Sequence, residues 1–510
     1  MISIYALDSK SIPYCTECYF KDDWDPMDYG VDYDSSRPFF EQFNELRLSV
    51  PQLHTRHSNN NGPESEYTNS TSYSSYAYLS YNVVKSDYIY YGFLINKENK
   101  MCVDSYNIRK NETYYELVNS NNNFKSVFLT DSDYCVESSF LFNCNNCINC
   151  FMCTNQRNKS YCFRNEQLTR EDYLKKISEI NFGDHYDFNK LKSEYENMLN
   201  NSIHCFANII KSDDCSGHAI ENSKNVKNSF NVSGCENLKY AIFSMNIHSD
   251  AYDVTVVGRG ERTYELVTSG GNGGNFDSKF CHRLQGGHNN EYCDTCKMGE
   301  NLFGCVGLSS KSYCILNKQY AKEEYFEMVE KIKKHMDEMP YVDKNGRVYK
   351  YGEYFPIEIS QVAYNETLAI EQFPLTKQEA LAQGYEWRDI ESKDYKHTVT
   401  RSEIPNNIKD VNDDILQEII ECPNQGDQNF QCTGAFRIVP DELQFYRQKK
   451  LPLPRLCPNC RHYERLKYRN PMKLYKRSCS NGCGNVFQTS YAPDRTERVY
   501  CESCYQKEVL

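Results

Sequence analysis

The chain has 510 residues, of which 39% are hydrophobic and 25% are charged, and its formal net charge is −12. This length predicts about three domains or a repeat array. The sequence has no apolar run near the roughly 18 to 20 residues that span a membrane, and its first ten residues, MISIYALDSK, lack the apolar core of a signal peptide. We therefore expect a soluble protein of the cytoplasm, or of a virion or viral factory.

The 25 cysteines are the strongest compositional signal. In a secreted chain they would indicate disulfides. Without a signal peptide, metal binding is the better interpretation.

The chain contains an internal repeat. Residues 153–173 align with residues 305–325 at an offset of 152, and the run Lys-Ser-Tyr-Cys occurs at 159–162 and again at 311–314. Two related units are therefore predicted. Acidic residues at the end of each unit, such as Glu171 and Glu323, indicate the first turn of a helix, where the helix dipole favours negative charge.

A shorter period appears inside the second unit. Asn225-Val226-Lys227 recurs twelve residues later as Asn237-Leu238-Lys239. Short alternating apolar segments with Asn, Ser, Gly and Cys at turns favour a mainly β fold, with two tandem β-helix (β-solenoid) units whose Asn side chains stack along the turns. An irregular β-sandwich is the alternative.

The carboxyl-terminal cysteines have the spacing of zinc ribbons. Cys479 and Cys483 are followed after 17 residues by Cys501 and Cys504, and Gly482 and Gly484 permit a tight turn. A second site combines Cys457 and Cys460 with an upstream pair of looser spacing. That upstream pair is Cys422 and Cys432.

The amino terminus resembles the last knuckle. Residues 5–19 match residues 491–505 at an offset of 486, which places Cys15 and Cys18 opposite Cys501 and Cys504. The first cysteine pair of such a ribbon is absent, so we expect a truncated start, a site completed by another segment or subunit, or a vestigial knuckle. Two Zn²⁺ ions per chain are expected, and a third is an option.

Residues 436–446 and 454–461 resemble a zinc-ribbon domain, and the tail resembles a small domain with two CxxC knuckles 17 residues apart, although its first knuckle has three intervening residues. Together with the motifs at 24–30, 38–43, 364–367 and 373–376, they make the whole chain similar to a family of zinc-ribbon proteins from candidate-phyla bacteria and giant viruses. The resemblance implies architecture and no activity.

Cys144, Cys147, Cys150 and Cys153 follow one another at three-residue intervals. This spacing is found in iron–sulfur proteins. At the offset of 152 only two of the four positions are cysteines, so we favour structural thiols over a zinc or iron–sulfur site.

Residues 445–477 form a basic island with eleven cations and one acid, in a chain whose remainder carries −22. We take these cations as candidate nucleic-acid contacts. They are Arg447, Lys449, Lys450, Arg455, Arg461, Arg465, Lys467, Arg469, Lys473, Lys476 and Arg477. A solvated face, a surface docked on the acidic body of this same chain, and an acidic protein partner are the alternatives.

These observations predict a non-catalytic zinc-binding interaction protein that contacts nucleic acid or a ribonucleoprotein, with no membrane role. A scaffold that docks other proteins and a polymer-acting enzyme with a β-helix groove are the alternatives. The expected layout is a half ribbon (1–30), a helical linker (31–64), two β-helical units with terminal helices (65–200 and 201–339), a mixed connector (340–415) and two zinc ribbons (416–470 and 471–510).

Overall fold

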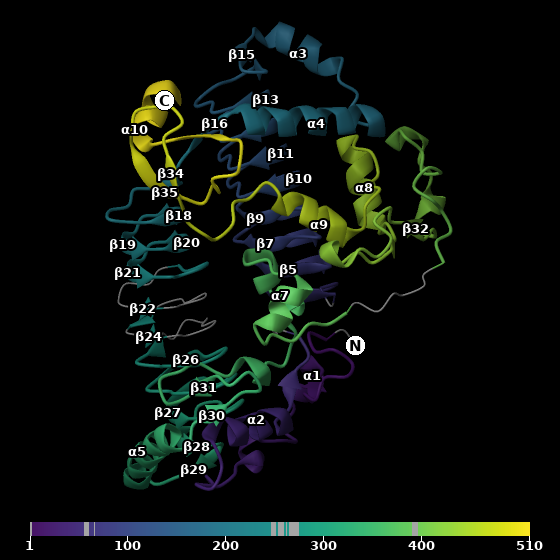
Figure 1. Cartoon of the computed structure of the whole chain (residues 1–510). Helices are drawn as coiled ribbons and strands as arrows, with labels where there is room; N and C mark the ends of the chain where they lie inside the picture. Colours follow the sequence, from purple (N-terminus) through teal and green to yellow (C-terminus); the bar gives the residue numbers. More distant parts are fainter. Residues whose placement is uncertain are drawn as a thin grey trace.

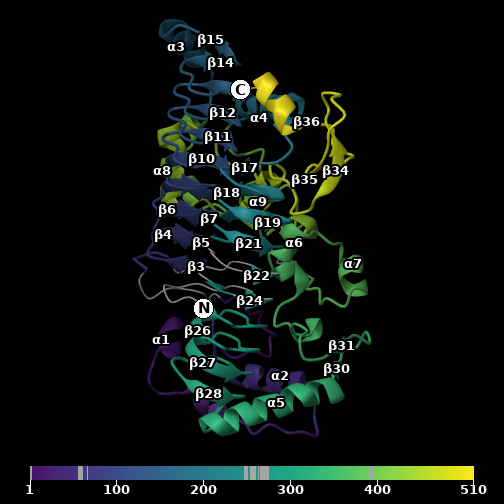
Figure 2. The same cartoon turned by 90° about the vertical axis from the view of Figure 1, so that its left-hand side faces the viewer.

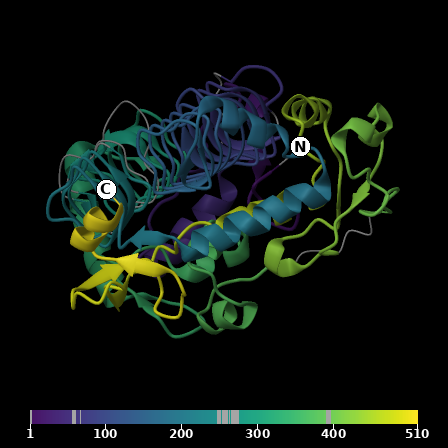
Figure 3. The same ribbon diagram turned by 90° about the horizontal axis from the view of Figure 1, so that it is seen from above.

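The computed structural model describes residues 3–55, 61–65, 67–245, 251–252, 260–261, 263–264, 275–389 and 396–509. More of these residues lie in strands than in helices, which confirms the strand-rich class. Two stacks of strands stand side by side, and helices and the carboxyl-terminal segments cover one side of them (Figure 1, Figure 3). Within the described ranges, no helix has both the length and the apolar character needed to cross a membrane.

The first stack is built from short parallel strands. Its strands are β3 (Thr68–Ser72), β4 (Ser75–Tyr78), β5 (Ser80–Val84), β6 (Asp87–Tyr90), β7 (Phe93–Asn96), β8 (Lys100–Val103), β9 (Tyr106–Arg109), β10 (Glu112–Val118), β11 (Val127–Thr130), β12 (Ser139–Phe142), β13 (Phe151–Thr154) and β14 (Cys162–Phe163). Val127 pairs with Ser139, and Ser139 pairs with Phe151, so the chain returns to the same lateral position every twelve residues. The antiparallel strand β15 (Glu166–Gln167) closes this stack.

The second stack is also built from parallel strands, most of them paired at the same twelve-residue interval. Its strands are β17 (Ile209–Ile210), β18 (Gly217–Glu221), β19 (Lys224–Lys227), β20 (Ser229–Ser233), β21 (Glu236–Lys239), β22 (Ala251–Tyr252), β23 (Gly260–Glu261), β24 (Thr263–Tyr264), β25 (Asn275–Phe276), β26 (Gln285–His288), β27 (Lys297–Phe303) and β28 (Ser312–Ile315). Val226 pairs with Leu238, as the twelve-residue period predicts. The antiparallel strand β29 (Lys318–Gln319) ends the stack.

The backbone turns at regular corners. From Ser70 to Lys97, and again from Glu98 to Arg164, every third residue has a positive φ. L-residues enter this left-handed region at a cost, and Asn enters it more readily than most because its side chain can hydrogen-bond locally. The recurrent Asn residues therefore have a conformational role at these corners.

Between the corners, one side chain in three points into the stack. Some of these are aliphatic, such as Leu129, and the Ser, Cys and Asn side chains among them bond to backbone carbonyls. Ser120 Oγ donates to Val118 O at 2.9 Å and to Leu129 O at 3.3 Å. Asn side chains twelve residues apart also bond to each other, as Asn123 does to Asn111 at 3.1 Å. These bonds satisfy polar groups that would otherwise be costly to bury.

The helix that precedes each stack packs on the other stack. Helix α2 (Phe39–Ser49) places Phe39 5.2 Å from Phe303 of the second stack, measured between ring centroids. Helix α4 (His185–Asn201) donates from Tyr195 Oη to Leu141 O of the first stack at 2.8 Å. Figure 1 shows α2 beside β28 and α4 beside β13. The segment expected as a linker to the first stack therefore belongs to the core of the second.

Helices α3 (Arg170–Ser178) and α5 (Lys322–Glu338) follow the two stacks, as predicted. The remaining elements are short. They are β1 (Pro13–Tyr14), α1 (Thr16–Tyr19), β2 (Gln52–Leu53), β16 (Ile203–Cys205), β30 (Tyr341–Val342), β31 (Val348–Tyr349), α6 (Ala369–Gln372), α7 (Lys377–Ala382), β32 (Ile420–Glu421), β33 (Ala435–Phe436), α8 (Pro440–Lys449), α9 (Pro458–Leu466), β34 (Tyr475–Ser478), β35 (Val486–Thr489), β36 (Arg498–Tyr500) and α10 (Glu502–Val509), with 3-10 turns at 26–29, 357–359, 364–366, 408–410, 413–416 and 428–430.

Two exposed lysines of the first stack test the corner geometry. Lys110 has a φ of 52°, whereas Lys100 lies within strand β8 and has no positive φ. We expect Lys110→Gly to raise the free energy of unfolding by roughly 0.5–1 kcal/mol, because glycine enters the left-handed region without a steric penalty. The matched variant Lys100→Gly should lower it by a similar amount, and denaturant unfolding of both variants measures the difference. Equal effects of the same sign would contradict the corner interpretation.

Candidate metal centres and the basic island

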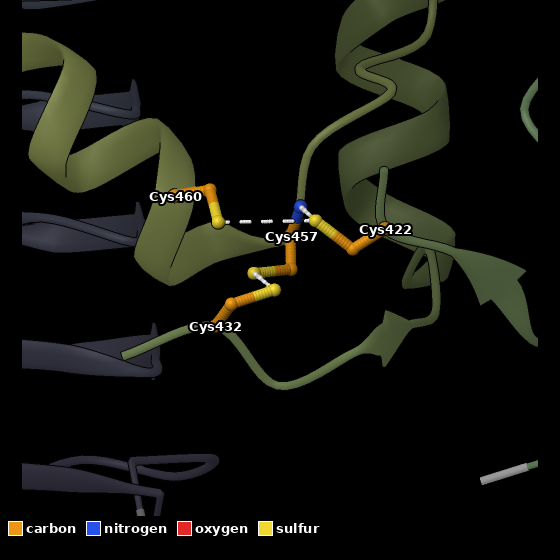
Figure 4. Close-up of side chains that lie close together, drawn as sticks. All are labelled: Cys422, Cys432, Cys457 and Cys460. Carbon is orange, nitrogen blue, oxygen red and sulfur yellow. Dashed lines mark hydrogen bonds between the residues drawn. The ribbon is translucent and has the colours of Figure 1, made fainter. Parts of the chain in front are cut away.

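The first four-cysteine cluster joins two segments of the chain. Cys422 follows β32, Cys432 lies in the turn between β32 and β33, and Cys457 and Cys460 belong to the start of α9. Figure 4 shows the four side chains converging, and all four are buried. The four cysteines predicted as one close pair and one pair of looser spacing are therefore brought together in space.

The sulfur distances of this cluster fit a tetrahedral metal. Cys422 Sγ lies 3.8 Å from Cys460 Sγ, and Cys457 Sγ lies 3.9 Å from Cys432 Sγ. Four sulfurs at the usual Zn–S bond length would be about 3.8 Å apart. Hydrogen bonds from the neighbouring Cys422 and Cys460 thiols lower the pKa of Cys457, which favours the thiolate that a metal requires.

The second cluster lies at the end of the chain. Cys479 and Cys483 come from the β34–β35 hairpin, and Cys501 and Cys504 come from the start of α10. Cys483 Sγ is 3.7 Å from Cys501 Sγ, and an Asn485 hydrogen bond helps lower the pKa of Cys501 to about 5. Gly482 and Gly484 both have positive φ, as expected for the tight turn between the first two ligands. Both clusters are thus compatible with zinc.

The N-terminal pair is not part of such a cluster. Cys15 is half-buried and Cys18 is exposed. Among the residues that the structure describes, only the two carboxyl-terminal groups bring three or more possible ligands together.

The regular cysteine run in the first stack makes the same contacts as the inward serines. Cys144 Sγ donates to Phe142 O and to Cys153 O, both at 3.5 Å. Ser120 donates to the same two relative positions, so Cys occupies an inward site that Ser also fills. The four cysteines of this run point into the stack and do not form a compact group like the two clusters within the described part of the chain. These contacts are those expected of structural thiols.

The centre of the basic island is buried. Arg461 is 4% exposed and Arg465 is 1% exposed, and both lie on α9. Arg461 Nε is 2.9 Å from Asp104 Oδ2, and Arg465 donates to Asp104 Oδ1 at 2.9 Å. Arg461 and Arg465 are therefore unavailable to a phosphate. The prediction that Arg461 and Arg465 contact nucleic acid is wrong, because both guanidinium groups are buried against acidic residues of the first stack.

Further groups complete this buried ion cluster. Arg461 lies 3.4 Å from Glu442 Oε1 and over the ring of Tyr91, while Arg465 lies 3.8 Å from Glu116 Oε1. Burial raises the pKa of Glu116 to about 7 and also raises the pKa of Glu442. Asp104 and Glu116 were not predicted as partners of the basic island. They are twelve residues apart and so occupy equivalent positions on neighbouring repeats of the first stack.

Most other cations of the island also contact the protein itself. Arg447 binds Asp413, Arg455 binds Asn406, Arg469 binds Tyr106 and Gln372, Arg477 donates to Ala492 O and Glu497 O, and Lys467 pairs with Glu464. No ion pair within the described residues involves Lys449, Lys450, Lys473 or Lys476; Lys449 is half-buried and the other three are exposed. The island is mainly a docking surface for this chain, which was one of the stated alternatives.

A partly open pocket lies between the two stacks and the segment that follows α9. Tyr106, Asp131, His218, Arg469 and Met472 help to line it, and its volume is about 30 Å³. Burial raises the pKa of Asp131 to about 7. A volume of this size is enough for one or two water molecules.

Comparison with known proteins adds little. No family model and no curated protein matches the chain. Among solved structures, a "putative acetyltransferase" from Desulfovibrio desulfuricans G20 is 10% identical, with 50% of this chain and 68% of that chain covered, and a TM-score of 0.13. A similarity this weak supports no argument. The resemblance to the zinc-ribbon family therefore stays a prediction.

The metal clusters can be tested against the inward thiols. We expect Cys460→Ser to reduce bound zinc from two ions to one per chain, because three thiolates hold structural zinc poorly. Cys150→Ser should retain both ions, because Ser138 already occupies the preceding position of the same column. Elemental analysis of the purified variants measures this. Loss of metal from the Cys150 variant would contradict the structural interpretation of the run.

The buried ion cluster should be costly to break. Arg465→Met leaves Asp104 and Glu116 buried with less compensating charge, and we expect the free energy of unfolding to fall by about 3–5 kcal/mol. Lys467→Met, two residues away on the exposed side, should change it by less than about 0.5 kcal/mol. Chemical denaturation measures both. A small effect at Arg465 would show that the cluster does not stabilise the docking of α9.

Proposed function

We propose that this chain is a non-catalytic, zinc-stabilised interaction protein with a β-solenoid trunk. The twelve-residue register of both stacks, their inward Ser, Cys and Asn side chains and the repeated corners support the solenoid assignment. In this assignment each rung is stable because the next rung covers it.

The observation that carries the proposal is the double role of α9. Its first turn supplies two ligands of the first cluster, Cys457 and Cys460, and its following turns supply Arg461 and Arg465 to the buried ions of the first stack. A metal bound by these ligands holds the helix start in place and so presents both guanidinium groups to the trunk. The ribbon then acts as a clamp on the solenoid.

We propose that the partner is another protein. Internal binding of Arg461 and Arg465, together with the contacts of Arg447, Arg455, Lys467, Arg469 and Arg477, leaves few cations for a phosphate backbone. The first stack also presents large apolar side chains at its surface: Tyr73 is 58% exposed and Tyr134 is 54% exposed. Exposed aromatic side chains along a regular trunk suit protein docking more than polyanion binding.

Nucleic-acid binding is the second candidate. Lys473 and Lys476 are exposed on and beside strand β34, next to the second zinc cluster. A ribbon hairpin with free lysines can contact a phosphate backbone.

One experiment tests the clamp and separates the partner classes. Chelation of zinc should increase hydrogen exchange in α9 and not in the inner strand β12, because of these two elements only α9 depends on the metal.

Binding to a 30-nucleotide single strand should be weak in the zinc-loaded protein and insensitive to Lys473→Glu with Lys476→Glu. Salt-sensitive binding that these two changes abolish would favour the second candidate, and unchanged exchange in α9 would contradict the clamp.

A further inference from the structure

The two four-cysteine clusters differ in their access to solvent. All four thiols of the first cluster are buried, whereas Cys483 of the second cluster is exposed. Cys483 lies in the loop between β34 and β35, next to Gly482 and Gly484, and a side-chain carbon at either glycine would have nothing within 4 Å. Figure 2 shows the β34–β35 hairpin at the edge of the molecule. Among the cysteines of the two clusters, solvent therefore reaches Cys483 most directly.

Cys483 also differs from its neighbours in its hydrogen bonds. In the first cluster, Cys457 N donates to Cys422 Sγ at 3.3 Å. In the second cluster, Cys501 N donates to Cys479 Sγ at the same distance. Within the described part of the chain, no N–H group donates to Cys483 Sγ, whose hydrogen bond is with Cys501 Sγ at 3.7 Å. An N–H donor stabilises a thiolate and makes it a weaker nucleophile, so Cys483 keeps a nucleophilicity that the other sulfurs lose.

We propose that the second cluster is a redox-responsive zinc site, which a hydroperoxide opens at Cys483, and that the first cluster holds its metal permanently. The proposal rests on the proposed function, because it requires zinc in both clusters, and it adds a means of regulation. The two clusters then have different tasks, although each offers four cysteines.

The chemistry takes two steps. The Cys483 thiolate attacks one oxygen of the hydroperoxide, a sulfur–oxygen bond forms, the oxygen–oxygen bond breaks, and the leaving oxygen takes up a proton. The Cys501 thiolate, 3.7 Å away, then attacks the sulfur of the resulting sulfenic acid, and hydroxide leaves and becomes water. Two sulfurs are oxidised to one disulfide and the peroxide is reduced. Zinc leaves because two of its four ligands are lost.

The second cluster is placed where its loss changes the contact between the last ribbon and the trunk. Strand β36 pairs with β16 in the segment that joins the two stacks. Tyr505 Oη of α10 donates to Asn155 Oδ1 of the first stack at 3.1 Å. A zinc ion bound by the cluster joins α10 to the β34–β35 hairpin, so its release should loosen this ribbon. The ligands of the first cluster lie on other elements, and α9 should stay docked.

The zinc-loaded full-length protein tests the proposal by treatment with hydrogen peroxide. We expect one of its two zinc ions to be released roughly ten times faster than the other, because only one cluster exposes a thiolate. A chromogenic chelator measures the release, and peptide mapping should find a disulfide between Cys483 and Cys501. Hydrogen exchange should increase in β36 and α10 and stay unchanged in α9.

Two variants separate Cys483 from other thiols. Cys483→His should keep the second ion, because His is also a zinc ligand, and should slow its release roughly tenfold, because its ring has no sulfur to oxidise. The control Cys205→Ser should release zinc like the unmodified protein. Cys205 is a half-buried thiol that packs against the same cluster and lies outside the ligand set. If Cys483→His loses the second ion, the disulfide found in the unmodified protein decides.

The outcomes also separate this proposal from the proposed function. Equal release rates for the two ions, earlier release from the first cluster, or a disulfide that does not join Cys483 to Cys501 would overturn the redox role alone. Two ions that both resist peroxide would do the same. A protein that binds no zinc before treatment would overturn the proposed function as well.

Discussion

The return of the chain to the same lateral position every twelve residues constrains the whole trunk. Twelve residues close a rung only if the backbone turns sharply at short intervals, and the positive φ at every third residue from Ser70 to Arg164 provides these turns. The inward positions hold either aliphatic side chains, such as Leu117 and Leu129, or small polar side chains that bond to nearby carbonyls, and Ser120 and Cys144 therefore make the same contacts. Side chains between the corners are left to pack on neighbouring elements.

The crossed arrangement of the two halves follows from these neighbouring elements. Helix α2 comes before the first stack and packs on the second, and helix α4 comes before the second stack and packs on the first. The last ribbon also belongs to the first stack, where Tyr505 Oη donates to Asn155 Oδ1 at 3.1 Å. Each stack therefore depends on segments from the other half of the chain, so the two repeats form one packed unit.

The buried ion pairs depend on a match between the spacing of neighbouring strands in the first stack and the spacing of residues along α9. Asp104 and Glu116 lie on adjacent rungs, which are about 4.8 Å apart, and Arg461 and Arg465 are one helical turn apart, a rise of about 6 Å. Helix α9 can thus bring both guanidinium groups to Asp104 and also place that of Arg465 near Glu116. Removing these charges from water is costly, and the mutual attraction and hydrogen bonds offset that cost only when the helix is held in register. In the proposal, a metal bound by the four cysteines at and before the start of α9 has this role.

The sequence by itself predicted the local features of this protein: the repeat, the twelve-residue period, the helices after each stack and the two four-cysteine groups. The first three depend on residues that are near in sequence or spaced at a fixed interval, and the cysteine groups were predicted from the close spacing within their pairs. The partners of the basic island, the crossed helices and the setting of Cys15 and Cys18 were decided only in the tertiary structure. A lysine or arginine run has the same composition whether water, a phosphate or Asp104 compensates its charge, and only the packing of α9 on the first stack selects among them.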